Sequence, residues 1–229
     1  MTVVVLLGAP GAGKGTQAPV LARHLDVPIL ASGDLLRAAV SAGTALGREA
    51  DRYMSRGQLV PDETIVRVFL DRLEHADARG GAILDGFPRT RIQAEALDTA
   101  LQAAGRRVDV AIFIDVPTED LILRMANRRI CTANGHVYNL ASNPPHRAAI
   151  CDVDGSELIQ RPDDHEETVR ARMAEQIKPL FDVVDHYRTS GVLATVDGRD
   201  PIERVSRDLL AVVERALTPP TIVTPDGGR

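Results

Sequence analysis

A glycine-rich stretch near the N-terminus constrains the fold of this chain more than any other segment. Residues 8–16 follow the apolar run of residues 3–7 and precede a helical pattern through Leu21 and Leu25. That order predicts a buried strand, a glycine loop and a helix. Without Cβ atoms, the glycines let successive backbone N–H groups surround an anion at the positive end of the helix. The loop therefore predicts a phosphate site, with Lys14 as its mobile cation.

The loop fits the spacing G-x-x-x-x-G-K but departs from the general pattern at the next position. Gly15 stands where a Ser or Thr usually holds Mg²⁺ directly, and the hydroxyl comes one residue later at Thr16. A glycine turn without a ligand is the alternative interpretation. The spacing favours a nucleotide, but it does not identify the reaction.

The rest of the chain predicts one α/β domain. Its 229 residues are 44% hydrophobic, which is enough for one substantial core. Apolar runs predict further strands at residues 27–31, 82–85, 108–115 and 192–196, with helices between them, broken over residues 34–76 at Gly43, Gly47 and Gly57. This alternation indicates a parallel sheet with ligands at the carboxyl ends of its strands.

Composition and short patterns narrow the function further. The formal charge of −5 argues against a nucleic-acid surface, and no apolar run is long enough to span a membrane. Because a core strand follows Met1 and Thr2 directly, we expect a cytoplasmic protein. We interpret Asp34 as a helix N-cap, and Asp163 with Glu166 as a capping box at the start of the helix that contains Pro179. Residues 129–161 are too long for an ordinary connection and indicate a lid or small insert.

Four motifs in order, at residues 8–17, 32–37, 84–90 and 161–164, resemble those of the adenylate kinase family. The resemblance covers about residues 1–215 and includes the long lid of the bacterial type. It implies a P-loop NTPase three-layer fold with a five-stranded parallel sheet. The implied core comprises residues 1–30, 61–126 and 165–217, with a helical AMP-binding arm at 31–60 and a small β-rich lid at 127–164. Residues 218–229, rich in Pro, Gly and Thr, are expected to form a disordered tail.

The resemblance implies reversible, Mg²⁺-dependent phosphoryl transfer, ATP + AMP = 2 ADP, and it assigns the sites. The implied ATP site comprises Gly11, Ala12, Gly13, Lys14, Gly15, Thr16, Arg124, Arg128, Val137, Tyr138, Gly198 and Asp200. The implied AMP site comprises Ser32, Arg37, Gln58, Leu59, Val60, Gly86, Phe87, Pro88, Arg89, Gln93, Arg161 and Arg172. The implied catalytic residues are Lys14, Asp85, Arg89, Arg128, Arg161 and Arg172.

Chemistry supports these assignments independently, because transfer between two polyanions needs cations from several directions. A single arginine would be a solvated surface charge, but these arginines stand at motif positions. Asp85 ends a strand like a Walker-B acid, so we expect it to hold Mg²⁺ through water. The guanidinium of Arg124 could stack on the donor adenine, and Gln93 can pair with the adenine of AMP. Ser32 also occurs in GTP-using relatives, which leaves the donor base open.

The lid departs from the zinc-binding pattern of relatives, which carry Cys-x-x-Cys before the insert and Cys-x-x-Cys or Cys-x-x-Asp after it. The corresponding residues are Cys131, Asn134, Cys151 and Asp154. Because Asn is not a usual zinc ligand, the sequence favours a lid held by hydrogen bonds and packing, without a metal. Zinc on three protein ligands and a Cys131–Cys151 disulfide are the alternatives.

We therefore expect a monomeric adenylate kinase that binds ATP and AMP or ADP, with no nucleic-acid or membrane partner. A GTP:AMP phosphotransferase is the alternative within the same class. A catalytically weak module that senses nucleotides is the alternative from another class, although the full set of cations argues against it.

Overall fold

A five-stranded parallel sheet forms the centre of the computed structural model, which describes residues 2–54, 60–161 and 164–218, apart from the side chains of Met54 and Arg172. The strands lie in the order β2-β3-β1-β4-β8. This confirms the predicted α/β fold with a parallel sheet. The strand bounds are β1 Thr2–Leu7, β2 Ile29–Ala31, β3 Gly81–Asp85, β4 Val110–Asp115 and β8 Leu193–Asp197.

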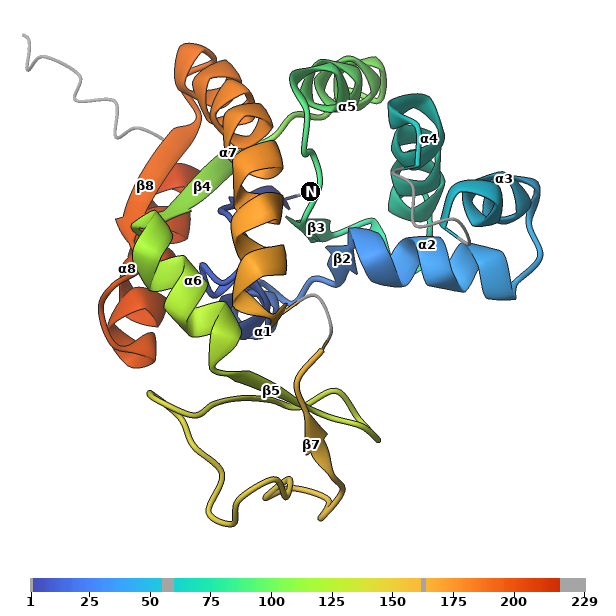
Figure 1. The fold of residues 1–229 in the computed structure, drawn as a ribbon. Helices are drawn as coiled ribbons and strands as arrows, with labels where there is room; N and C mark the ends of the chain where they lie inside the picture. The colour runs from blue at the N-terminus through green and yellow to red at the C-terminus, as the bar shows by residue number, and fades with distance from the viewer. Residues whose placement is uncertain (1, 55–59, 162–163, 219–229) are drawn as a thin grey trace, which may run out of the picture.

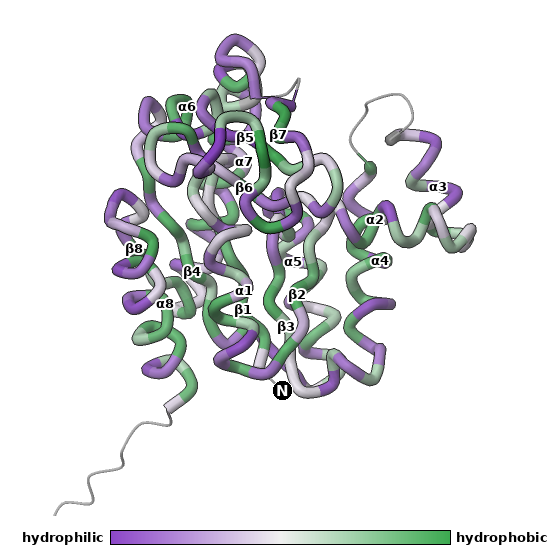
Figure 2. The backbone as a smooth tube through the Cα atoms, turned by 90° about the horizontal axis from the view of Figure 1, so that it is seen from below, coloured by the Kyte–Doolittle hydropathy of each residue, from purple (hydrophilic) through white to green (hydrophobic). Residues whose placement is uncertain are grey.

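Helices cover both faces of this sheet (Figure 1). The central strand β1 is buried on both faces, which explains its unbroken apolar sequence. Val3 and Val5 pack with α4, α5 and the C-terminal part of α7, whereas Val4 and Leu6 pack with α1, α6 and α8. Figure 2 shows the hydrophobic colouring of β1 and β3. The helices are α1 Lys14–Leu25, α2 Ser32–Ser41, α3 Ala45–Met54, α4 Asp62–Leu73, α5 Arg91–Ala103, α6 Thr118–Ala126, α7 Glu166–Thr189 and α8 Ile202–Leu217, with a 3-10 turn at Ala76–Ala78.

The carboxyl ends of the strands lie along one edge of the sheet. Leu6 pairs with Asp85, Ala31 also pairs with Asp85, and Asp115 pairs with Asp197. The glycine loop, the start of α2 and the segment after β8 therefore begin at this common edge, where open parallel sheets bind their ligands.

A second, three-stranded antiparallel sheet lies in the insert, which we define as residues 127–164. Its strands are β5 Arg128–Cys131, β6 Val137–Asn139 and β7 Leu158–Ile159, in the order β6-β5-β7. It is separate from the main sheet and stands off from it (Figure 1). A small core of Cys131, Tyr138, Cys151 and Leu158 holds it together.

Two local predictions were wrong. Gly47 does not break a helix but lies within α3, and α2 begins at Ser32 after Ala31, so Asp34 lies in the first turn and is not the N-cap. Helix α7 begins at Glu166, with His165 as its N-cap. Gly57, tail residues 219–229 and residue 163, on which the predicted capping box depends, lie outside the described residues.

Among the residues that the structure describes, no helix is both long enough and apolar enough to cross a membrane.

Candidate active site

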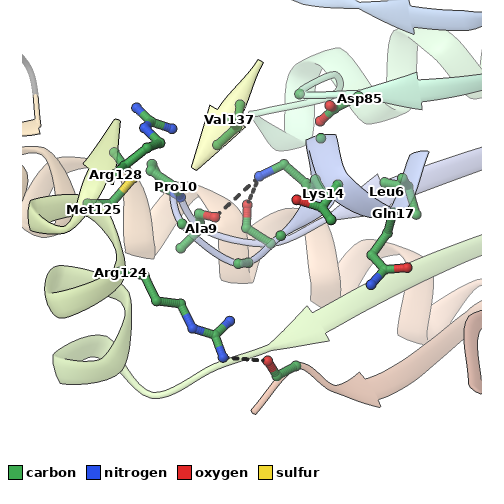
Figure 3. A pocket seen from close by; sticks show the side chains of 18 of the residues that line it. Leu6, Ala9, Pro10, Lys14, Gln17, Asp85, Arg124, Met125, Arg128 and Val137 are labelled. Carbon is green, nitrogen blue, oxygen red and sulfur yellow. Dashed lines mark hydrogen bonds between the residues drawn. The ribbon is translucent and has the colours of Figure 1, made fainter. Parts of the chain in front are cut away.

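A cavity of about 1370 Å³ lies at the carboxyl edge of the main sheet. The glycine loop forms its floor, and further walls come from the ends of β2 and β3, from α6, from the insert and from the segment after β8. Figure 3 shows Lys14, Asp85, Arg124, Arg128 and Val137 around it. The cavity therefore joins segments that are far apart in the sequence.

The glycine loop has the backbone conformation of an anion site. Gly11 and Gly13 have φ values of 86° and 97°, which disfavour any residue with a Cβ. A Cβ at Gly11 would also lie 3.1 Å from the carbonyl oxygen of Leu121. Helix α1 begins at Lys14, directly after the loop, so its free N–H groups and its positive dipole end face the cavity floor.

Lys14 and Asp85 form the electrostatic centre of the cavity. The Lys14 amino group donates hydrogen bonds to the carbonyl oxygens of Gly8 at 2.6 Å and Ala9 at 3.3 Å. Burial lowers the pKa of Lys14; the Asp85 carboxylate opposes this shift, and Arg89 and Arg128 add to it. Burial raises the pKa of Asp85, against the opposing charges of Lys14 and Arg89. Several cations therefore lie near the Asp85 carboxylate. A polyphosphate bound together with a metal ion requires such an arrangement.

Arg89 lies at the end of the cavity formed by β2 and β3. Its guanidinium donates to the hydroxyl of Ser32 at 2.9 Å and to the carbonyl oxygen of Gly86 at 2.7 Å. These two contacts come from the residues that directly follow β2 and β3, so the arginine is oriented by the sheet edge itself.

Arg124 and Arg128 lie at the other end, near the C-terminus of α6 and the start of β5. Arg124 donates to the carbonyl oxygen of Gly198 at 2.8 Å. Arg128 makes a two-pronged ion pair with Asp164, at 2.8 Å and 2.5 Å, and the Asp164 side chain is fully buried. Such paired, planar contacts fix the direction of a guanidinium.

The structure brings many of the sequence-predicted residues together. All of the predicted ATP-site residues line the cavity, as do Asp85, Ser32, Gly86, Pro88, Arg89 and Arg161. Tyr138 does so although its ring belongs to the small core of the insert. Arg37, Val60, Phe87 and Gln93 are not among the lining residues. Gln58 and Leu59 lie outside the described residues, and Arg172 is described only as part of α7.

Two of these non-lining residues have clear structural surroundings. Phe87 is buried and stacks on Phe69, with 4.0 Å between ring centroids. Arg37 is exposed and pairs with Asp34 at 2.5 Å. The side chain of Phe87 therefore belongs to the core.

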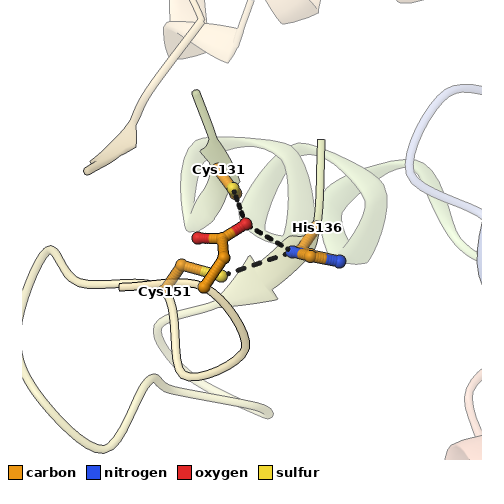
Figure 4. A group of neighbouring side chains, drawn as sticks. Cys131, His136 and Cys151 are labelled. Carbon is orange, nitrogen blue, oxygen red and sulfur yellow. Dashed lines mark hydrogen bonds and ion pairs between the residues drawn. The ribbon is translucent and has the colours of Figure 1, made fainter. Parts of the chain in front are cut away.

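The insert contains a cluster that could hold a metal ion. Its members are Cys131, His136, Cys151 and Asp154, whose ligand atoms all lie within 4.8 Å of one another (Figure 4). The His136 Nδ1 atom lies 3.3 Å from both the Cys151 Sγ and an Asp154 carboxylate oxygen. The two cysteines are not joined in a disulfide.

The chemistry of this donor set fits zinc. Two thiols, one imidazole and one carboxylate are ordinary zinc ligands, and ligand atoms around one tetrahedral zinc lie within about 4 Å of each other. Burial raises the pKa of the Cys131 thiol, but hydrogen bonds from Ser156 and the Asn134 backbone outweigh it and bring the pKa to about 7. Hydrogen bonds from Ser156 and Asn134 also lower the pKa of Asp154. Both groups are therefore held near their ligating forms.

His136 was not among the predicted ligands, because the pattern of the zinc-binding relatives places the second ligand position at Asn134. In the structure the Asn134 amide donates to the Asp154 carboxylate at 2.8 Å, so it supports a ligand rather than replacing one. The available signal was the hairpin: a turn with Gly135 places residue 136 opposite Cys131, whose N–H donates to the His136 carbonyl at 2.9 Å.

Gln17 was also left without a role. It is buried, donates to the Ile202 carbonyl at 3.1 Å and accepts from the Ser206 hydroxyl at 2.7 Å. Gln17 therefore ties α1 to the start of α8, next to the segment that follows β8.

Comparison with known proteins agrees with this site. Residues 6–192 match the family model described as adenylate kinase. An adenylate kinase of Staphylococcus aureus is 44% identical over 211 residues, which cover 92% of this chain and 98% of the relative. An adenylate kinase of Streptomyces griseus is 46% identical, covering 89% of this chain and 93% of the relative, and one of Staphylococcus epidermidis is 42% identical, covering 92% and 98%. With a matching family model over most of its length and relatives this similar, the chain belongs to the adenylate kinase family.

Proposed function

We propose that the protein transfers the terminal phosphate of ATP to AMP, producing two molecules of ADP. The observation that carries the proposal is the cavity, in which a phosphate loop and Lys14 meet Arg89, Arg128 and Arg161 from three other segments. Phosphoryl transfer between two polyanions depends on such converging cations and on in-line positioning more than on a general base. The relatives named adenylate kinase support the same reaction.

The two ends of the cavity suggest separate roles for its residues. At the donor end, the loop from Gly11 to Thr16 would bind the ATP phosphates, and Arg124 with the Gly198 segment would hold the base. At the acceptor end, Ser32, Gly86, Pro88 and Arg89 would hold AMP. Arg37, Gln58, Leu59, Val60, Phe87, Gln93 and Arg172 are assigned to AMP or to its phosphate by the family resemblance alone.

Two peripheral segments would close over the bound nucleotides. Residues 31–60 would act as the AMP-binding arm and residues 127–164 as the lid, each moving against the core formed by the remaining residues up to 217. Closure would exclude water, so that phosphate passes to AMP and not to solvent. We propose that the protein acts in the cytoplasm as a monomer without a nucleic-acid partner, in keeping with its net charge of −5.

Mg²⁺ would supply charge neutralisation on the transferred phosphate. Asp85 is the residue that would hold it, through water, because its carboxylate lies beside Lys14 at the end of β3. Thr16 lines the same cavity and offers a hydroxyl.

We also propose that the insert carries a structural zinc ion on Cys131, His136, Cys151 and Asp154. This reverses the preference for a metal-free lid that the sequence alone suggested. A closed set of four protein ligands is typical of structural zinc and would crosslink β5, the following hairpin turn and residues 151–154.

The function is tested by measuring ADP formation from ATP and Mg²⁺ with AMP, UMP, CMP or no acceptor, and with GTP in place of ATP. Rapid ADP formation with ATP and AMP alone supports the proposal. Equal rates with GTP would favour the phosphotransferase alternative. Tight nucleotide binding without transfer to any acceptor would refute the enzyme and support the sensing module.

The zinc site is tested by quantifying metal in the purified protein and in His136→Ala. We expect about one zinc per chain in the unmodified protein, and a clear loss of zinc and of melting temperature in the variant. His146→Ala is the matched control, because His146 lies in the same insert, is 90% exposed and pairs with Asp152 outside the cluster. Retention of stoichiometric zinc by His136→Ala would exclude His136 as a ligand.

A further inference from the structure

One carboxylate links the first turns of two helices next to the acceptor end of the cavity. Asp62, the first residue of α4, accepts a hydrogen bond from the Gln93 side-chain amide at 2.7 Å. Its other oxygen accepts from the Thr90 hydroxyl at 3.0 Å. Gln93 is only 4% exposed, so its amide depends on these protein partners.

The partners of Gln93 determine which way its amide faces. The Arg89 backbone N–H donates to the amide oxygen at 2.7 Å, while the amide nitrogen donates to Asp62. A backbone N–H can only donate and an ionised carboxylate can only accept. Rotating the amide by 180° would set its NH₂ group against the Arg89 N–H and its oxygen against the carboxylate. Only the observed orientation of the Gln93 amide lets it bond both the Arg89 N–H and the Asp62 carboxylate.

Thr90 holds the backbone of the same residue. It is the N-cap of α5, and its hydroxyl accepts from the Gln93 backbone N–H at 3.2 Å while donating to Asp62. Asp62 therefore restrains both the side chain of Gln93 and the helical turn that carries it. Arg89 and Thr90 line the cavity, which places Gln93 beside it.

The fixed amide has one lone pair and one N–H left, and these define a base preference. Adenine offers a donor at its 6-amino group and an acceptor at N1, which match a carbonyl oxygen and an N–H in a fixed order. Hypoxanthine offers the reverse, an acceptor at position 6 and a donor at N1, and would be matched only by a flipped amide.

We propose that Asp62 is a positioning residue that selects AMP over 6-oxopurine nucleoside monophosphates by preventing the Gln93 amide from flipping. The proposal rests on the proposed function, in which Gln93 contacts the base of the acceptor. Asp62 itself does not touch the nucleotide in this arrangement.

The test is Asp62→Asn, which keeps the shape of the side chain but can donate as well as accept. We expect the ratio of kcat/KM for AMP to that for IMP to fall about tenfold, the size of one misdirected hydrogen bond. The KM for AMP should rise, and the KM for ATP should stay unchanged. Glu63→Gln, an exposed neighbour in the same helical turn, removes the same charge and should leave the ratio unchanged.

A double-mutant cycle separates positioning from a general structural effect. In a Gln93→Ala background, Asp62→Asn should cause no further change in the AMP to IMP ratio, because the amide that it orients is gone. An unchanged ratio in Asp62→Asn alone, or an equal fall in both backgrounds, would overturn the inference. Failure of the unmodified protein to phosphorylate AMP at all would instead refute the proposed function.

Discussion

Replacing Gly47 by alanine should destabilise the protein, although the same change usually stabilises a helix. Gly47 lies inside α3, and its N–H donates to the Thr44 hydroxyl at 2.9 Å. A Cβ added there would overlap the carbonyl group of Ala39 in α2 and lie 2.7 Å from the N atom of Val40. Since these neighbours are backbone atoms, they cannot move aside as a flexible side chain could.

The size of the stability loss depends on how far α2 and α3 must move apart. The contact with Val40 has to lengthen from 2.7 Å to about 3.4 Å, an ordinary van der Waals distance, and the contact with Ala39 has to lengthen further. Overpacking of this kind costs about 1–3 kcal/mol. The shift would also strain the hydrogen bonds of Thr44 to the Ala39 carbonyl, at about 1 kcal/mol. The higher helix propensity of alanine offsets about 1 kcal/mol of this destabilisation. We expect a net loss of about 1–3 kcal/mol in the free energy of unfolding.

Urea denaturation followed by circular dichroism measures this loss, since the chain has no tryptophan. Gly80→Ala is the control, because nothing lies within 4 Å of a Cβ at that position and its backbone is not left-handed. In the proposed arm, separation of α2 from α3 should also raise the KM for AMP and leave that for ATP unchanged. A variant as stable as the unmodified protein, or more stable, would refute the close packing of α3 on α2.

Three further changes have defined outcomes. Tyr187→Phe should raise the free energy of unfolding by about 1 kcal/mol, because the buried Tyr187 hydroxyl has no hydrogen-bond partner among the described residues; a loss of stability in calorimetry would indicate a hidden partner. Ser206→Ala should raise the KM for ATP but not for AMP in steady-state assays, because it leaves the buried Gln17 oxygen unpaired; equal effects on both would refute a role specific to the donor end. The hydrogen bond from Arg199 lowers the pKa of Asp197 from 3.8 to about 2. The interaction therefore contributes to folding stability above pH 4, and this contribution is lost as the pH falls to 2. Stability measured between pH 4 and pH 2 should therefore fall less in Asp197→Asn than in the unmodified protein.

The central strands of the sheet could be predicted from the sequence because β1, β3 and β4 are buried on both faces. The run of residues 3–7 is apolar throughout, and the structure buries Val3, Val4, Val5, Leu6 and Leu7. The position of the ligand-binding loops at the carboxyl ends of the strands followed from the parallel topology. The strand boundaries were predicted less accurately, since β4 begins at Val110, two residues later than the predicted strand.

Positions that depend on contacts between distant segments could not be predicted in the same way. Gly47 was interpreted as a helix breaker, yet its lack of a side chain serves the approach of α2 to α3. His136 was not predicted as a metal ligand, because the family spacing of the cysteines placed that ligand position at Asn134. Asp62 and Gln93 are 31 positions apart, and no periodicity in the sequence connects them.

The contacts of Lys14 within the loop affect how strongly a nucleotide can be held. Its ammonium group donates to the carbonyl oxygens of Gly8 and Ala9. Binding a polyphosphate therefore exchanges these contacts for new ones, and the net gain in free energy is smaller than the gross strength of a lysine–phosphate contact. The loop carbonyls recover their partner when the nucleotide leaves. For an enzyme that must release its product after every turnover, this exchange moderates affinity and favours rapid dissociation.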